Sequence, residues 1–178
     1  MRLLKPQKSG CTDNECGFYK NYYRAISTDR GYTWSVGQPV SGIGCVKPNL
    51  LRLGSAATSS PLLLTGGRFC TAKTSDLFLW FDGSGMATGW ANHSLSYVHN
   101  SLWRGDKAYK YDGRINSSAP YLSQSQDYTS LLRISDTDAL ITYNKYFHPG
   151  DAVPGCSGHE VCSSAFAMRV SVERVRPK

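Results

Sequence analysis

Residues 27–34 read Ser-Thr-Asp-Arg-Gly-Tyr-Thr-Trp, and this stretch decides the fold. Its pattern, S-x-D-x-G-x-T-W starting at Ser27, predicts a tight β-hairpin turn. Asp29 can accept hydrogen bonds from backbone N–H groups across the turn, and Gly31 can take the positive φ that a short hairpin needs. We expect Trp34 to begin the returning strand and to pack its ring back over the turn. A single surface hairpin would carry the same residues, so the rest of the chain has to show whether the turn is repeated.

The composition is that of a globular, turn-rich protein: 178 residues with 17 glycines, 8 prolines and 19% charged side chains. There is no window of eighteen apolar residues, so we expect no membrane-spanning helix. Residues 1–6 lack the apolar core of a signal peptide. Short apolar runs between turn-forming residues, with little helical periodicity, predict an all-β fold. The expected strands are residues 22–27, 49–53, 61–65, 77–81, 129–134, 139–144 and 165–170, with 109–111 as a further candidate.

An internal repeat follows the hairpin. Each copy has an apolar strand, a polar turn, a second apolar strand and, later, a third. The three strands are residues 49–53, 62–65 and 77–80 in one copy and residues 130–134, 140–143 and 165–168 in the other. The first strands are offset by 81 residues (130 − 49) and the third strands by 88 (165 − 77). We interpret the unit as one antiparallel meander, repeated with insertions of different length. Residues 91–127 are expected to form a long, loop-rich insertion.

A second, stretched copy of the turn follows the third strand of the first meander. Asp82, Gly85 and Trp90 repeat the Asp, Gly and Trp positions, and Asp82 lies 53 residues after Asp29 (82 − 29). Repeat units of propeller blades are about 40–50 residues long. Both turns have the pattern of the Asp-box, the blade turn of sialidase-like β-propellers. We call residues 27–34 the first box and residues 82–90 the second box.

Over residues 22–176 the chain resembles the C-terminal half of the sialidase (neuraminidase) superfamily. The first box carries this resemblance together with residues 127–132 and 140–143, which are similar to the family's Tyr-Ser-x-Leu and Leu-Tyr-Glu strand pair. The resemblance implies a sialidase-like β-propeller of four-stranded antiparallel blades. Residues 1–178 would be a single partial domain of about three to four blades, a fragment lacking the N-terminal blades of a ring of about six.

The resemblance also implies site residues. Tyr128 matches the catalytic nucleophile, which is a tyrosine in sialidases. A neutral phenol suits this substrate because the sugar's own carboxylate would repel an anionic nucleophile. Arg68 and Arg104 match two of the family's three carboxylate-binding arginines, whose planar guanidinium groups bind a carboxylate bidentately. If these residues have no catalytic or binding role, Tyr128 would pack at the start of a strand and the two arginines would be solvated.

One position departs from the family. The glutamate that activates the tyrosine is replaced by Lys47, in the sequence Val-Lys-Pro-Asn-Leu. A positively charged side chain cannot act as the same anionic base. Two functions therefore stay open: an exo-α-sialidase-like glycoside hydrolase that removes terminal sialic acid, and a non-catalytic Asp-box propeller that binds glycans or protein partners. A third, weaker alternative is a propeller that uses the boxes only as structure.

Cysteines and sequons favour a secreted or lumenal protein. Cys11 with Cys16 and Cys156 with Cys162 are close pairs in polar loops, which suggests local disulfides of undetermined connectivity. The glycosylation sequons are Asn92-His93-Ser94 and Asn116-Ser117-Ser118.

The net charge of +7 is spread without clusters, which argues against nucleic acid. It suits an acidic, sialic-acid-like sugar, although an ordinary basic solvated surface is the more common cause of such a balance. The histidines are expected in loops without metal-ligand spacing. We therefore expect neither a metal nor a cofactor.

Overall fold

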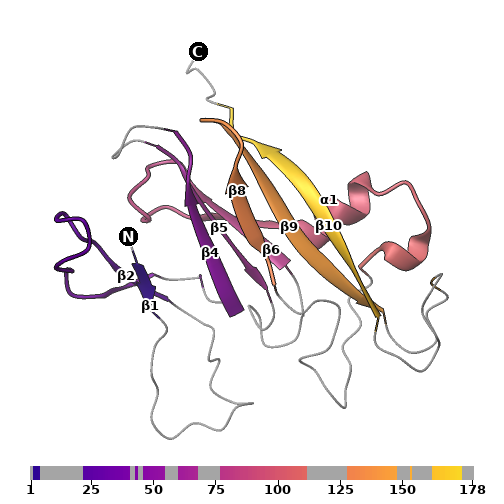
Figure 1. Ribbon diagram of the computed structural model, residues 1–178, viewed down its shortest axis with the longest axis horizontal. Helices are drawn as coiled ribbons and strands as arrows, with labels where there is room; N and C mark the ends of the chain where they lie inside the picture. The colour runs from indigo at the N-terminus through magenta and orange to yellow at the C-terminus, as the bar shows by residue number, and fades with distance from the viewer. Residues whose placement is uncertain are drawn as a thin grey trace, which may run out of the picture.

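The computed structural model of this chain describes residues 2–4, 22–40, 43, 46–54, 60–67, 77–111, 128–147, 153 and 162–173 (Figure 1). Within these residues the strands form three antiparallel sheets. The first contains β1 (Arg2–Leu4), β2 (Tyr22–Ala25) and β3 (Gln38–Val40). The second contains β4 (Val46–Arg52), β5 (Leu62–Gly67), β6 (Leu77–Asp82) and β7 (Ala91–Ser94). The third contains β8 (Ser130–Arg133), β9 (Asp138–Phe147) and β10 (Cys162–Ser171).

The all-β prediction is confirmed, and so is the repeated meander. In the second sheet the spatial order is β4-β5-β6-β7, and in the third it is β10-β9-β8, so neighbouring strands follow one another along the chain in both. Strands cover all seven of the main expected ranges, with small shifts at their ends.

Both boxes occupy equivalent places in their sheets. The first box joins β2 to β3, and the second box joins β6 to β7, so each closes the hairpin between the last two strands. This shared position is what a turn repeated once per meander requires.

Some expectations were wrong. Residues 107–109 form a 3-10 turn, η1 (Lys107–Tyr109), rather than part of a strand at 109–111. The segment expected to be loop-rich begins with β7 and continues as a helix, α1 (Leu95–Leu102). Ser94 caps this helix, because its side chain accepts a hydrogen bond from the backbone N–H of Tyr97.

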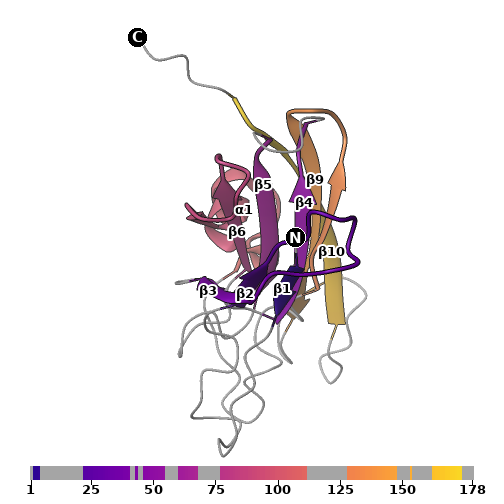
Figure 2. The same ribbon diagram turned by 90° about the vertical axis from the view of Figure 1, so that its left-hand side faces the viewer.

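The two central strands of the four-stranded sheet, β5 and β6, are largely buried and pack on both faces. All six residues of β5 are buried, and adjacent leucines on it serve different clusters because successive strand residues point to opposite faces. Leu63 packs in a cluster with Ile141 of β9, whereas Leu64 packs with Tyr22 and Val40 of the first sheet. Figure 2 shows β4 and β5 running beside β9 and β10. The sheets therefore pack face to face along the chain.

Candidate functional site

The candidate site lies where the first strands of the second and third sheets meet. Strands β4 and β8 contact each other and lie side by side in Figure 1. Tyr128 and Thr129 directly precede β8. The Asn49 side-chain amide on β4 donates a hydrogen bond to the Thr129 carbonyl oxygen, and the Thr129 hydroxyl donates to that of Thr65 at 3.0 Å. Thr129 and Thr65 are both buried. The backbone that carries Tyr128 is therefore fixed to both β4 and β5.

A bulge in β4 brings Lys47 to this position. The register between β4 and β5 shifts between Val46 and Asn49, and Lys47 has a φ of 50°. This left-handed conformation is uncommon for a residue with a side chain. Bulges redirect side chains and occur often beside functional sites. Here the Lys47 Nζ lies 3.1 Å from the centroid of the Tyr128 ring, a close cation–π contact.

The pair is open to solvent. Tyr128 is 55% exposed, and Lys47 is also exposed. In the part of the chain that the structure describes, no carboxylate pairs with Lys47 and no group hydrogen-bonds to the Tyr128 hydroxyl. The site thus offers a phenol and an ammonium group on one surface, with no anionic base beside them among the described residues. Such a surface can attract an anion and can stack or hydrogen-bond a polar ring.

The structure describes only one of the two predicted arginines. Arg68 lies outside the described residues. Arg104 follows α1, where its Nη1 donates a hydrogen bond of 2.6 Å to the Ser101 carbonyl oxygen. It is exposed and lines a cavity of about 400 Å³ together with Trp103 and Phe166. Its described contacts include neither Tyr128 nor Lys47. The structure therefore brings Tyr128 and Lys47 together, while the carboxylate-binding roles of the arginines stay predictions.

The first box has the predicted turn geometry, but the expectation that Trp34 begins the returning strand is wrong, because β3 starts at Gln38. The Asp29 carboxylate accepts hydrogen bonds from the Thr33 backbone N–H at 2.8 Å and the Thr33 hydroxyl at 2.6 Å. The Ser27 hydroxyl donates to the same carboxylate at 2.7 Å. These bonds, led by those from Thr33, lower the pKa of Asp29 to about 2. Gly31 has a φ of 96°, and the Trp34 indole N–H donates to the Gly31 carbonyl oxygen at 2.9 Å.

The second box keeps the aspartate but uses its tryptophan differently. Asp82 is buried and accepts hydrogen bonds from the backbone N–H groups of Ser84 and Ala87 and from the Ser84 hydroxyl. Gly85 has a φ of 71°, as a glycine in this turn should. The indole N–H of Trp90 is buried, and no group in the described part of the chain accepts a hydrogen bond from it. Trp34 closes its own turn, whereas Trp90 does not.

The remaining predicted positions are only partly described. Cys162 starts β10 and is disulfide-bonded, whereas Cys11, Cys16 and Cys156 lie outside the described residues. Asn92 is exposed on β7, and Asn116 lies outside the described residues. The two local disulfides and the glycosylation of both asparagines therefore stay predictions.

A buried polar cluster beneath α1 was missed. The expectation that the histidines lie in loops is wrong for His93, which lies on β7, and for His99, which is a buried residue of α1. One ring nitrogen lies 3.0 Å from the Tyr143 hydroxyl and the other 3.1 Å from the Tyr109 carbonyl oxygen. Burial lowers the pKa of His99 and raises that of Tyr143 to about 12. The spacing of Leu95 and His99, four residues apart, is a helical signal that could have revealed this buried face.

Lys145 lies in the same region and is fully buried. Its Nζ donates a hydrogen bond to the Tyr146 carbonyl oxygen at 3.1 Å and lies 4.5 Å from the centroid of the Phe147 ring. These contacts offset part of the cost of burying a charge.

Within the described ranges, no three His, Cys, Asp or Glu side chains are grouped to hold a metal ion. No helix in those ranges is long and apolar enough to cross a membrane. Comparisons with protein-family models, with curated proteins and with solved structures gave no match. Function is therefore inferred from the residues and their geometry.

Proposed function

We propose that the three sheets are successive blades of a sialidase-like β-propeller. Three features support this architecture. The second and third sheets are meanders in chain order. Both boxes join the last two strands of their sheets. The first strands β4 and β8 contact each other, as strands nearest a propeller axis do.

We further propose that the Tyr128–Lys47 site gives the protein an exo-α-sialidase-like activity, the hydrolysis of terminal sialic acid from glycoconjugates. One observation carries this proposal. The resemblance assigns the nucleophile to position 128 and its activating residue to position 47, which are 81 residues apart (128 − 47). These two side chains meet at 3.1 Å. A chance likeness of motifs gives no reason for that contact.

Tyr128 and Lys47 would have different roles in the reaction. The Tyr128 oxygen would attack the anomeric carbon as the bond to the leaving oxygen breaks, and water would then release the sugar from the tyrosine. The Lys47 ammonium would attract the carboxylate that sits on the anomeric carbon of a sialic acid. No anionic base accompanies Tyr128 among the described residues, so the phenol proton would pass through solvent water to the leaving oxygen at this exposed site. The water that later releases the sugar would return a proton to the tyrosine oxygen.

Lys47 itself favours a second candidate function. An ammonium group on the ring of the nucleophile binds an anion without removing a proton. A site of this kind would hold an acidic glycan and release it unchanged. The second candidate is therefore a non-catalytic propeller that binds sialylated glycans. In both candidates the partner is an acidic sugar, and the paired cysteines and sequons suit an extracellular or lumenal location.

The test of hydrolysis measures cleavage of a fluorogenic α-ketoside of sialic acid by the wild-type protein and by Tyr128→Phe. We expect the variant to lose at least about 100-fold in rate, because the phenol oxygen is the attacking atom. Tyr97→Phe is the matched control, since Tyr97 is a 74%-exposed tyrosine on α1. Absence of turnover by folded wild-type protein, or full activity of Tyr128→Phe, would overturn the proposed activity.

A binding experiment with the same proteins distinguishes the non-catalytic function from hydrolysis. Saturable binding to sialylated glycans without turnover supports the non-catalytic function. That binding should weaken in Lys47→Gln and should persist in Lys107→Gln, which removes an exposed lysine from η1.

A further inference from the structure

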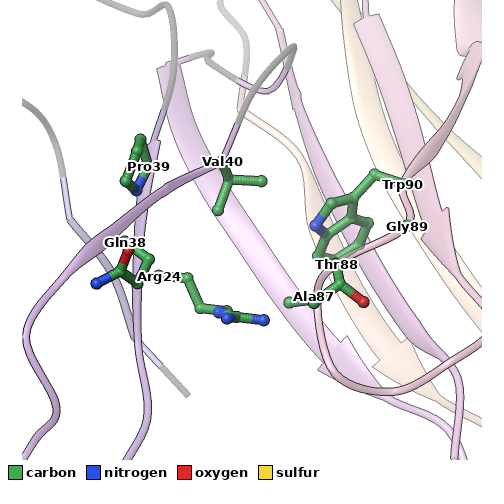
Figure 3. Close-up of a pocket in the computed structure, with 8 residues that line it drawn as sticks. All are labelled: Arg24, Gln38, Pro39, Val40, Ala87, Thr88, Gly89 and Trp90. Carbon is green, nitrogen blue, oxygen red and sulfur yellow. The ribbon is translucent and has the colours of Figure 1, made fainter.

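A pocket of about 400 Å³ lies between the first sheet and the second box (Figure 3). Its size falls within the usual range of small-molecule sites, about 300–1,000 Å³. One wall comes from β2 and β3 and the other from the end of the second box, and neither Tyr128 nor Lys47 lines it. The lining residues are Arg24, Gln38, Pro39, Val40, Ala87, Thr88, Gly89 and Trp90.

The pocket presents hydrogen-bond donors. Arg24 donates from Nη1 to the Met86 carbonyl oxygen at 2.7 Å, which fixes its guanidinium beside the box and leaves further N–H groups. The Trp90 indole nitrogen is buried and has no hydrogen-bond partner among the described residues. Figure 3 shows Arg24 and Trp90 on opposite walls, with the Arg24 guanidinium and the Trp90 ring nitrogen facing the space between them. A buried donor without a partner is costly unless a ligand or water accepts from it.

The other lining groups define the kind of ligand. Among the described lining residues there is no carboxylate, and the nearby Asp82 is engaged with the backbone of its own turn. Gln38 and Thr88 add neutral polar groups, whereas Pro39 and Val40 add apolar surface. The pocket therefore suits a small ligand that has a negative charge, hydroxyl groups and an apolar ring face together.

We propose that this pocket is a second ligand site that binds one carboxylate-bearing sugar unit. The carboxylate pairs with the Arg24 guanidinium. Ligand entry moves aside the groups that cover the Trp90 indole nitrogen, and a ring oxygen or hydroxyl then accepts its hydrogen bond. The site is independent of hydrolysis at Tyr128. It would hold either a free acidic monosaccharide or the acidic end of a glycan, because both present the same groups.

The Trp90 indole N–H itself provides the test. The chain has four tryptophans, so its ¹⁵N–¹H spectrum has four indole signals, assignable by single Trp→Phe variants. Titrating the full chain with N-acetylneuraminic acid and with glucuronic acid should move the Trp90 signal saturably. Glucose, which lacks the carboxylate, should not move it. Trp80 is the internal control, because its indole N–H is also buried and unpartnered among the described residues but lies outside the pocket lining.

Substitutions then test whether the Arg24 guanidinium binds the carboxylate of the ligand. Arg24→Gln should weaken the binding of both acids by about tenfold or more, since charge-assisted hydrogen bonds are about twice as strong as neutral ones. Arg30→Gln removes the same charge from an exposed turn position and should leave binding unchanged. Tyr128→Phe should also leave the Trp90 titration unchanged, which separates this site from the proposed hydrolase.

Either sugar source supports the proposal. Sialyllactose that binds as tightly as the free acid shows that the linked sugar fits, and weaker binding shows a preference for the monosaccharide. The proposal is overturned if the Trp90 signal stays still in the wild-type titration, moves equally with glucose, or moves only together with that of Trp80.

Discussion

The two boxes share a sequence pattern but differ in what surrounds them. The first box lies at the surface, and its hydrogen bonds join residues within its own turn, from Ser27 to Trp34. The second box is tied to other parts of the chain. Arg52 of β4 donates to the carbonyl oxygens of both Gly85 and Ser60, each at 3.1 Å. Arg24 of β2 reaches the same box at Met86.

This difference shows that one motif can serve two purposes. Asp29 and its partners need only the local chain, so the first box is a self-contained hairpin. The second box uses its carbonyl oxygens to hold strands of two sheets. Substitutions at matched positions should therefore cost more in the second box than in the first.

The largest effect is expected at the two glycines. A Cβ on Gly85 would collide with the Ser60 carbonyl oxygen and lie 3.0 Å from the Arg52 guanidinium, at a φ of 71°. Among the described residues, the nearest atom to a Cβ on Gly31 is Cζ2 of Trp34 at 3.8 Å, although φ is 96°. We expect Gly85→Ala to lower the free energy of unfolding by about 2–5 kcal/mol and Gly31→Ala by about 1–2 kcal/mol. Urea denaturation of both variants measures this, and equal losses would contradict the comparison.

The next effect is expected at the aspartates. Asp82→Ala leaves the backbone N–H groups of Ser84 and Ala87 without their acceptor. The bond to Ala87 is buried, and its loss should cost about 1–3 kcal/mol. Asp29→Ala exposes the freed groups to water, so its loss should be smaller. Thermal unfolding followed by circular dichroism compares the two. A larger fall in Tm for Asp29→Ala would show that the first box matters more.

Acid should weaken the first box through Asp29. The pKa of this carboxyl is lowered from 3.8 to about 2 by hydrogen bonds from Thr33 and Ser27, so the folded state favours the ionised form. Its contribution to stability is complete above pH 3.8 and is lost as the pH falls toward 2. The free energy of unfolding of Asp29→Asn should change less over this range than that of the wild type. Parallel curves would argue against the hydrogen-bonded carboxylate. Asp138, whose pKa is also lowered, keeps its own acid dependence in both proteins.

The smallest effect is expected at the tryptophans. Trp34→Phe removes the hydrogen bond to the Gly31 carbonyl oxygen and should cost about 0.5–1.5 kcal/mol. Trp90→Phe removes an N–H that has no partner among the described residues, so the free energy of unfolding should change less. Denaturant titration without added sugar measures both. A clear destabilisation by Trp90→Phe alone would indicate a partner for that N–H.

Local chemistry explains which features were predictable. The Asp29 turn and the repeated meander follow from turn residues and from apolar spacing, and both were predicted. Tyr128 and Lys47 could be named as site candidates from the sequence, because the resemblance assigns roles to Tyr128 and to the position that Lys47 occupies. The bulge that turns Lys47 onto the ring was not predicted, because it depends on the pairing of β4 with β5.

Features that depend on contacts between sheets were missed. The environment of Trp90 is set by Arg24 and Val40, which come from another sheet. The sequence predicts a loop where α1 forms, because the helix is short and lies in a polar segment. Its cap at Ser94 and its buried side at His99 are visible only as single residues in the sequence.

The most direct test of the proposed site is the mass of the peptide that contains Tyr128 after the protein reacts with a 3-fluorosialyl fluoride. Such a reagent transfers its sugar to a retaining nucleophile, and the fluorine slows release of the sugar. We predict that one sugar is added at Tyr128 in the wild type and that none is added in Tyr128→Phe. An unmodified Tyr128 in protein that stays folded throughout the reaction would contradict its assignment as the nucleophile.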